Sequence, residues 1–229
     1  MNLYWIIFIG IAVISWIVQY RFKSKFKKYS EMPLSSGLSG AEVAQKMLQE
    51  NGLHDVKIIS VEGKLTDHYN PADQTVNLSP EVYHGRSVAA AAVASHECGH
   101  AVQHATAYSW LQFRSAMVPI VSIASRMTTW VLLGGVLLMA FSGNIWVLAI
   151  GVGALFLTTL FSFITLPVEF DASNRALAWL DTAGITHSRD EHDGAKDALK
   201  WAAMTYVVAA LAALATLLYY ASILFGRRD

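Results

Sequence analysis

The strongest chemical signal in the 229-residue sequence is the run His96-Glu97-Cys98-Gly99-His100, which has the pattern H-E-x-x-H. On a helix, residues four positions apart lie one above the other, so both imidazoles project from one face toward a shared point. Two neutral ring nitrogens at that separation suit a zinc ion, with Zn–N bonds of ~2.0–2.1 Å. Glu97 lies one step around the helix, where it can act as general base toward zinc-activated water without being a ligand.

The segment before the motif distinguishes a zinc site from a chance match. Residues 88–94 are apolar on almost every side of a helix, which is typical of a buried helix. Burying two histidines and a glutamate there without a metal would cost free energy. We therefore interpret the motif as a zinc site, Cys98 as a small packing residue, and Gly99 as room for a close neighbour.

The composition places this helix in a membrane protein. Only 15% of the residues are charged and the net charge is zero, whereas soluble domains carry ~25% charged residues. This excludes a disordered chain and a nucleic-acid binder with a large basic surface, and the single cysteine excludes a disulfide framework. Four segments approach the ~20 apolar residues of a membrane span: Leu3 to Tyr20, Ala116 to Phe141, Ile145 to Val168 and Ala202 to Phe225.

Basic residues predict the orientation of these spans. Five of them, between Arg21 and Lys28, follow the first apolar segment, which we interpret as an uncleaved anchor with its C-terminal end in the cytoplasm. Segments 21–115 and 169–201 hold 10 and 4 of the 17 Lys and Arg residues, and two crossings separate them, so both are expected on the cytoplasmic face. Arg126 lies inside the second span, and Arg227 and Arg228 fall on the opposite side.

The third zinc ligand must come from a distant segment. A catalytic site needs three protein ligands and one open position, and the residue six beyond His100 is Thr106, not histidine. Glu169 is the first carboxylate after the third apolar segment, on the predicted face of His96 and His100. We therefore expect the two-span hairpin to return the chain to the motif.

The polar segment before the motif predicts a small α+β unit. Ser39 and Glu42 form a capping-box pattern for a helix that ends at Asn51-Gly52. Residues 56–61 and 75–79 are predicted strands, with a turn at 70–73. Ser87 or Arg86 then opens the helix of the motif.

These motifs together resemble the YugP-type membrane zinc metallopeptidases, which are related in pattern to the HtpX-like gluzincins. The resemblance covers the anchor, its basic flank, NPADQTVNLSPEVYHGRS, VASHECGHAVQH, the hairpin and LPVEFDASNRA. It implies Zn²⁺ bound by His96, His100 and Glu169, with Glu97 as general base.

One departure from the gluzincin pattern concerns the residues around the ligands. Ser173 stands where an aspartate usually orients a zinc histidine, so Asp171 or Asn174 is the candidate for that role. The resemblance also suggests that residues 75–79 form an edge strand beside the site, which either pairs with an extended substrate or is an ordinary sheet strand.

Three further histidines have two interpretations each. His104 lies one turn beyond His100 and either donates to substrate or caps the helix. His187 and His192 either stabilise an oxyanion or belong to a solvated loop. Sequence alone leaves these alternatives open.

We therefore predict a mainly α integral membrane protein with a small β-sheet, about four transmembrane helices and a zincin-like HExxH domain at the cytoplasmic face. The expected function is a zinc endopeptidase of the plasma membrane that hydrolyses membrane-proximal or misfolded membrane proteins. Its expected partners are such a protein or peptide, the lipid bilayer, and an adaptor or second copy, with no nucleic acid. The expected parts are an anchor with its basic flank (1–28), the α+β part with the motif helix (29–115), a transmembrane hairpin (116–168), a cytoplasmic helix with the third ligand (169–201) and a last transmembrane helix (202–229).

Two other functions remain open at this point. The first is a non-catalytic scaffold with structural zinc, which needs a fourth protein ligand such as Asp171 or His104. The second is an intramembrane site-two-type protease, which places the motif within a span. The motif helix has only about 17 residues and polar flanks, which favours a site at the membrane surface.

Overall fold

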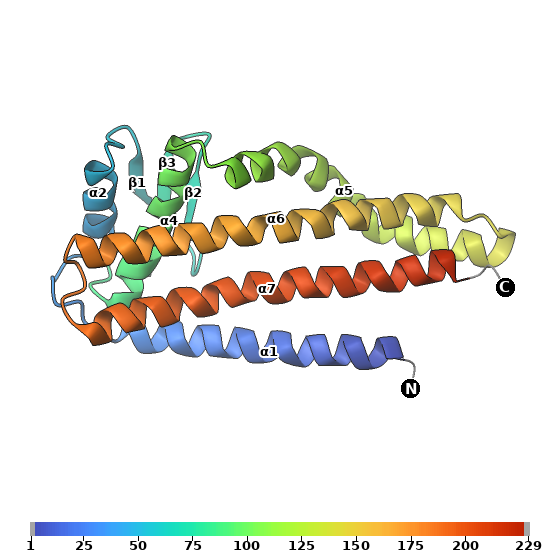
Figure 1. Cartoon of the computed structure of the whole chain (residues 1–229), viewed down its shortest axis with the longest axis horizontal. Coiled ribbons are helices and arrows are strands. Elements are labelled where there is room, and N and C mark those ends of the chain that lie inside the picture. The colour runs from blue at the N-terminus through green and yellow to red at the C-terminus, as the bar shows by residue number, and fades with distance from the viewer. Residues whose placement is uncertain (1–2, 227–229) are drawn as a thin grey trace. The chain divides into compact units, whose positions relative to one another are not determined.

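The computed structural model describes residues 3–226, so that Arg227 and Arg228 lie outside the described residues (Figure 1). The described chain is mainly helical with one small mixed sheet, as predicted. Its elements are α1 (Leu3–Ser30), α2 (Gly40–Glu50), β1 (Lys57–Ser60), β2 (His68–Asn70), β3 (Thr75–Leu78), α3 (Pro80–His84), α4 (Val88–Ala105), α5 (Ser109–Ser142), α6 (Trp146–Thr182) and α7 (Arg189–Phe225).

The described residues form two compact units. The apolar unit consists of residues 3–17, 113–166 and 206–226. The site unit consists of residues 18–112 and 167–205. Helices α1, α5, α6 and α7 each contribute one part to each unit.

The apolar unit holds most of the long apolar helices. Four helices, α1, α5, α6 and α7, are long and apolar enough to cross a membrane by length and composition. Large side chains lie on their surfaces, with Trp130 and Trp146 each 74% exposed and Phe141 88% exposed. A surface of this kind is unfavourable in water and typical of contact with lipid.

The helices extend well beyond the apolar segments. α6 continues past Val168 to Thr182, and α7 begins at Arg189. Residues 169–201 were expected as one cytoplasmic helix, but they are the end of α6 and the start of α7, joined by a turn. Gly184 adopts φ +61° in that turn, and Ile185 N–H donates to the carbonyl of Leu180, which ends α6.

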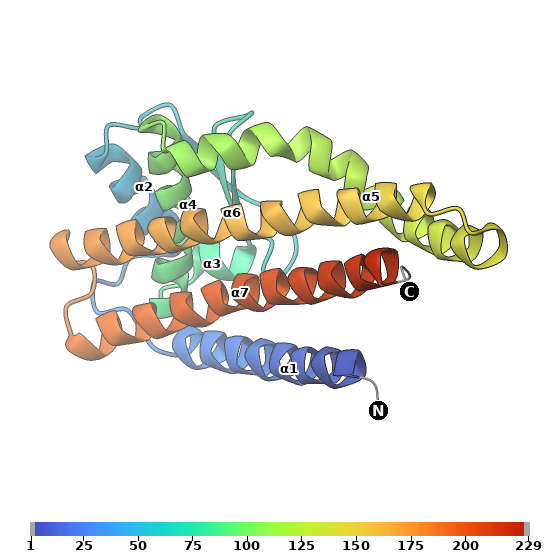
Figure 2. The ribbon, with the colours of Figure 1, turned by 45° about the vertical axis from the view of Figure 1, so that its right-hand side comes forward.

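The site unit has the local structure that its sequence predicts before the motif. The capping box at Ser39 and Glu42 is confirmed, and α2 ends at Asn51 with Gly52 at φ +72°. α2 lies against α4 (Figure 2). Buried apolar side chains of both helices form one core with the sheet. The residues at this core include Val43, Met47, Leu48, Val76, Leu78, Val88 and Ala91.

The sheet differs from the prediction in one respect that matters for the site. Its order is β1-β3-β2, with β3 parallel to β1 and antiparallel to β2. β3 is therefore the central strand, and all four of its residues are buried. The prediction that residues 75–79 form an edge strand is wrong, because β2 pairs with β3 and itself occupies that edge.

Candidate metal centre

Helix α4 carries the H-E-x-x-H motif in a buried position. Ser87 is its N-cap, and the Ser87 hydroxyl accepts from the backbone N–H of Ala90. The first turns are almost entirely alanine and are buried. Small side chains on every face let α4 pack closely on all sides. The helix therefore presents His96 and His100 from within the protein.

Helices α4 and α6 approach each other closely at Gly99. A Cβ atom added there would lie 2.7 Å from the carbonyl oxygen of Ala172, closer than real Cβ contacts allow. Gly99 therefore leaves room for the backbone of α6, as the sequence predicted. Ala172 lies one turn beyond Glu169, so this contact sets the depth at which α6 presents that carboxylate to α4.

Two histidines and one glutamate converge between these helices. His96 Nε2 lies 3.3 Å from Glu169 Oε2, and His100 Nε2 lies 3.7 Å from the same oxygen. One ligand atom from each of the three residues lies within 4.8 Å of the others. In a tetrahedral zinc site with bonds of ~2.0–2.1 Å, ligand atoms lie ~3.3 Å apart. The three residues thus fit a zinc ion in both chemistry and spacing.

The charge balance also suits a cation. The pKa of His100 is raised: burial opposes its positive charge, but the hydrogen bond with Glu169 and the charges of Glu97 and Glu169 outweigh burial. The same negative groups would favour a divalent cation, which displaces the proton on binding. Burial, together with the charge of Glu97, raises the pKa of the Cys98 thiol. Cys98 therefore stays protonated and has the packing role predicted for it.

Neutral side chains contact Nδ1 of both histidines, the ring nitrogen that does not face Glu169. Ser173 Oγ lies 3.1 Å from His96 Nδ1, and Gln103 Oε1 lies 3.0 Å from His100 Nδ1. Sequence reasoning did not identify either residue as such a partner. The available signals were that Gln103 follows His100 by three positions on a helix, and that Ser173 stands where gluzincins carry the orienting aspartate.

The three predicted outer residues have different positions. Asp171 reaches the site only through Gln103, whose Nε2 donates to Asp171 Oδ2 at 2.8 Å. Asn174 lies on the exposed side of α6. His104 is exposed, and its Nδ1 lies 2.9 Å from the hydroxyl of Tyr69. Among these three candidates, only Asp171 belongs to the hydrogen-bond network of a zinc histidine.

Glu97 is buried beside the metal group and contacts the sheet. It is 8% exposed, and its Oε2 accepts a hydrogen bond from the backbone N–H of Tyr69 at 3.1 Å. Tyr69 lies in β2, so the strand edge that faces α4 belongs to β2, where the sequence had suggested residues 75–79. The backbone of β2 thereby fixes the orientation of the Glu97 carboxylate.

Of the two histidines in the second polar segment, His187 takes part in the turn between α6 and α7. The backbone N–H of His187 donates to Glu191 Oε2 at 2.7 Å, and the backbone N–H of Ser188 donates to the same oxygen. His192 lies in the first turn of α7. The structure thus gives His187 a structural role in the α6–α7 turn and adds neither histidine to the metal group.

Comparison with known proteins agrees with this geometry. A family model described as "Putative neutral zinc metallopeptidase" matches residues 4–225. The Bacillus subtilis (strain 168) protein named "Putative membrane protease YugP" is 43% identical over 225 residues, covering 97% of this chain and 98% of that protein. No solved structure matches the chain. The resemblance inferred from the motifs is confirmed, and the chain belongs to the family of neutral zinc metallopeptidases that the model describes.

Proposed function

We propose that this protein is a membrane-embedded zinc endopeptidase in which Glu97 is the general base. The observation that carries the proposal is the convergence of His96, His100 and Glu169 around one point, with the Glu97 carboxylate held beside it. Three protein ligands leave a coordination position for a reacting group, which is the arrangement of catalytic zinc sites.

The chain's own groups divide the work of peptide hydrolysis. When bound, zinc supplies a Lewis acid that polarises the peptide carbonyl and acidifies water. Glu97 takes the proton of the attacking water and delivers it to the leaving amine. The N–H of Tyr69 holds the Glu97 carboxylate in place for both transfers. β2 borders the site, so we propose that an extended substrate lies alongside this strand.

A scaffold with a structural zinc ion is the alternative function. It needs a fourth protein ligand, for which Asp171 and His104 are the candidates. Asp171 Oδ2 accepts from Gln103 and from Arg175 Nε, the latter at 2.6 Å, and His104 contacts Tyr69. These partners favour the catalytic assignment over the structural one.

The decisive experiment compares wild-type protein with Glu97→Gln in detergent. Each is assayed for cleavage of an unfolded protein and for bound zinc, with Glu62→Gln as a control on an exposed loop glutamate. We expect Glu97→Gln to keep its zinc and lose activity by at least ~100-fold, because general base catalysis contributes that much or more. Zinc in all three proteins with cleavage by none would contradict the proposal and favour structural zinc.

The substrate class and the orientation are further parts of the proposal. We propose that the site faces the cytoplasm at the plasma membrane, because segments 21–115 and 169–201 hold 14 of the 17 Lys and Arg residues. A site at that surface would meet membrane-proximal segments and misfolded membrane proteins. In reconstituted vesicles, wild-type protein should cleave a membrane-anchored unfolded segment faster than the same segment in solution. Cleavage of small soluble peptides alone would contradict this substrate class.

A further inference from the structure

Gln103 holds an unusual position in the site unit. It is fully buried, with 0% exposure, and it follows the zinc histidine His100 by three residues on α4. Its Oε1 lies 3.0 Å from His100 Nδ1, while its Nε2 lies 2.8 Å from the carbonyl of Val168 and 2.8 Å from Asp171 Oδ2. One amide therefore connects a zinc histidine with two groups of α6.

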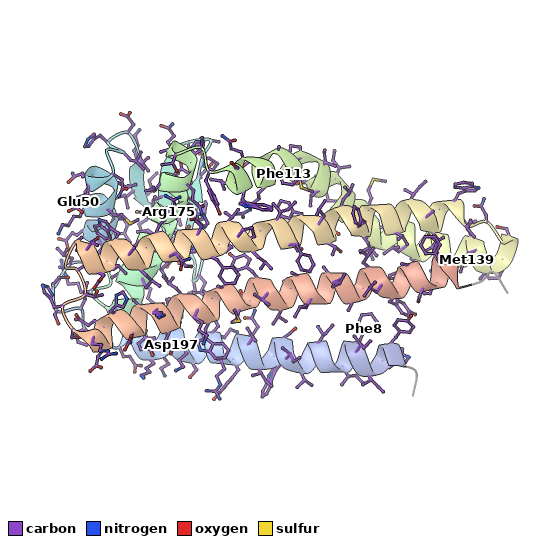
Figure 3. The ribbon with its side chains drawn as sticks, in the orientation of Figure 1. Phe8, Glu50, Phe113, Met139, Arg175 and Asp197 are labelled. Carbon is purple, nitrogen blue, oxygen red and sulfur yellow. The ribbon has the colours of Figure 1, made fainter. Side chains whose placement is uncertain are left out.

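The chemistry of these partners fixes the orientation of the amide. The Val168 carbonyl and the Asp171 carboxylate only accept hydrogen bonds, so the NH₂ end of Gln103 must face them. Arg175 Nε also donates to Asp171 Oδ2, at 2.6 Å; Arg175 is labelled on α6 in Figure 3. Both amide protons are thus used, and Oε1 is left to accept from His100.

This orientation determines the tautomer of the neutral His100 ring. Since Gln103 Oε1 cannot donate, Nδ1 of His100 carries the proton. Nε2, which lies 3.7 Å from Glu169 Oε2, then keeps its lone pair for a metal. A histidine that binds zinc through Nε2 needs this tautomer. Gln103 thus holds a proton on Nδ1, so that Nε2 is the nitrogen that gives up any proton to the ion and becomes the ligand.

The same amide ties together the two helices that supply the ligands. Val168 precedes Glu169 directly, and Asp171 follows it by two residues. Gln103 therefore holds the backbone of α6 at the position where α6 presents the third ligand. Glutamate would not replace it, because a carboxylate has no proton for the Val168 carbonyl and would face the negative Asp171.

We propose that Gln103 is the positioning residue of the zinc site, which fixes the tautomer of His100 and clamps α6 to α4. This inference rests on the proposed zinc chemistry but adds a role for a residue outside the ligand set. It predicts that losing the three hydrogen bonds of Gln103 weakens zinc binding while the fold is retained.

The first test measures zinc affinity by competition with a chelator on detergent-purified protein. Gln103→Leu should bind zinc ~10–100-fold more weakly, the usual effect of losing a residue that orients a ligand. Gln49→Leu, at an exposed position of α2, should bind as the wild type does. An affinity of Gln103→Leu within about twofold of wild type would overturn the inference.

The second test separates positioning from general destabilisation. In the zinc-loaded protein with ¹⁵N-labelled histidine, the buried Nδ1–H protons of His96 and His100 should exchange slowly and give separate resonances. Gln103→Leu should remove only the His100 resonance, and Ser173→Ala only that of His96, since Ser173 contacts His96 Nδ1. Loss of both resonances in Gln103→Leu would show that Gln103 supports the whole site and does not position His100 in particular, which would contradict the proposal.

The third test is a rescue. Gln103→Glu should weaken zinc binding, because its carboxylate faces Asp171 and cannot donate to the Val168 carbonyl. Adding Asp171→Asn supplies an amide donor to that carboxylate, so the double variant should bind zinc several-fold more tightly than Gln103→Glu alone. If the double variant bound zinc no more tightly than Gln103→Glu alone, the proposal that Gln103 clamps α6 to α4 would be wrong.

The failure of the clamp can be told apart from the failure of the proposed function. If His96→Ala leaves the zinc content of the protein unchanged, the ion does not occupy this site and the proposed function itself is wrong. If His96→Ala removes the zinc but Gln103→Leu does not weaken its binding, only the inference on Gln103 fails.

Discussion

The two parts of α6 use their buried polar side chains differently. In the apolar unit, buried hydroxyls such as Thr165 donate back to the helix, here to the carbonyl of Phe161 at 2.9 Å. In the site unit, the buried Glu169 and Ser173 instead contact His96 on α4. The hydroxyls of the apolar part thus donate to backbone carbonyls, either of α6 itself or, for Thr159, of α7, whereas the site part uses its polar groups to contact histidine side chains of α4.

Each unit also contains a glycine at which the backbones of two helices meet closely. A Cβ at Gly135 would lie 2.6 Å from the backbone of Leu148, where α5 meets α6. A Cβ at Gly99 would lie 2.7 Å from the carbonyl of Ala172, where α4 meets α6. The packing requirement is the same at both places. The consequences differ, because only the contact at Gly99 sets the spacing of zinc ligands.

The largest effect should come from removing a ligand. Glu169→Gln and His100→Ala should each weaken zinc binding by well over ~100-fold, because residues outside the ligand set already change affinity by ~10–100-fold. The apolar unit contains none of the three converging residues, so the helical content measured by circular dichroism in detergent should stay the same. Glu31→Gln, an exposed glutamate, is the control. Retention of zinc by both ligand variants would place the metal elsewhere.

The pair of glycines gives the next largest effect and tests the comparison directly. Gly99→Ala should destabilise the protein by ~1–3 kcal/mol through overpacking and should also weaken zinc binding. Gly135→Ala should cost a similar ~1–3 kcal/mol but leave zinc affinity unchanged. Thermal unfolding in detergent and chelator competition measure the two quantities.

Gly134→Ala is the matched control for this pair, since no atom lies within 4 Å of a Cβ there. It should not destabilise the protein, because alanine favours a helix by ~0.8–1 kcal/mol over glycine. If Gly135→Ala weakened zinc binding as strongly as Gly99→Ala, the functional difference between the two contacts would be wrong.

The smallest effect concerns α2, which lies in the site unit away from the ligands. Ser39→Ala should cost ~1 kcal/mol of stability through loss of the N-cap and should leave zinc affinity unchanged. The pKa of Glu42 is lowered by its hydrogen bonds to Ser39, with Arg86 adding to the shift. A lowered folded-state pKa stabilises the protein above the ordinary glutamate pKa, and this contribution is lost as pH falls through the folded value.

The stability of the wild-type protein should therefore decline as the pH falls through the folded-state pKa of Glu42. The part of this decline that Glu42 causes should be smaller in Ser39→Ala. Urea unfolding of both proteins across the acidic range measures the difference. The Ser39 backbone N–H keeps its hydrogen bond to Glu42 Oε2 in this variant, so equal pH dependence in the two proteins would show that the Ser39 hydroxyl does not contribute to the linkage. A change in zinc affinity in Ser39→Ala would contradict the separation of α2 from the site.

Local rules account for much of what the sequence predicted. Capping at Ser39 and Ser87, the glycine stop after α2 and the apolar lengths of four helices all depend on neighbours in the chain. The same holds for the H-E-x-x-H spacing, because helix geometry alone puts His96 and His100 on one face. These predictions needed no knowledge of what packs against what.

The helix at 169–201 and the edge position of residues 75–79 differ from the prediction for two physical reasons. A helix continues through polar residues because its hydrogen bonds lie in its own backbone, so the end of an apolar segment does not end α6. The order β1-β3-β2 depends on pairing between strands, which composition does not encode. The position of β3 was therefore decided by its partner strands, whereas α6 ends locally, at the turn that contains Gly184.

By itself, the sequence determined the groups on which the proposed chemistry depends: a pair of histidines spaced for zinc, a glutamate beside them, and enough apolar length for a membrane. Only the tertiary structure decided which groups complete that chemistry. The contact of Gly99 with α6 brings Glu169 to the histidines, and β2 reaches Glu97. Gln103 and Ser173 acquire partners on another element. Hydrogen bonds between distant segments require a specific three-dimensional approach, and residue spacing along one helix does not define it.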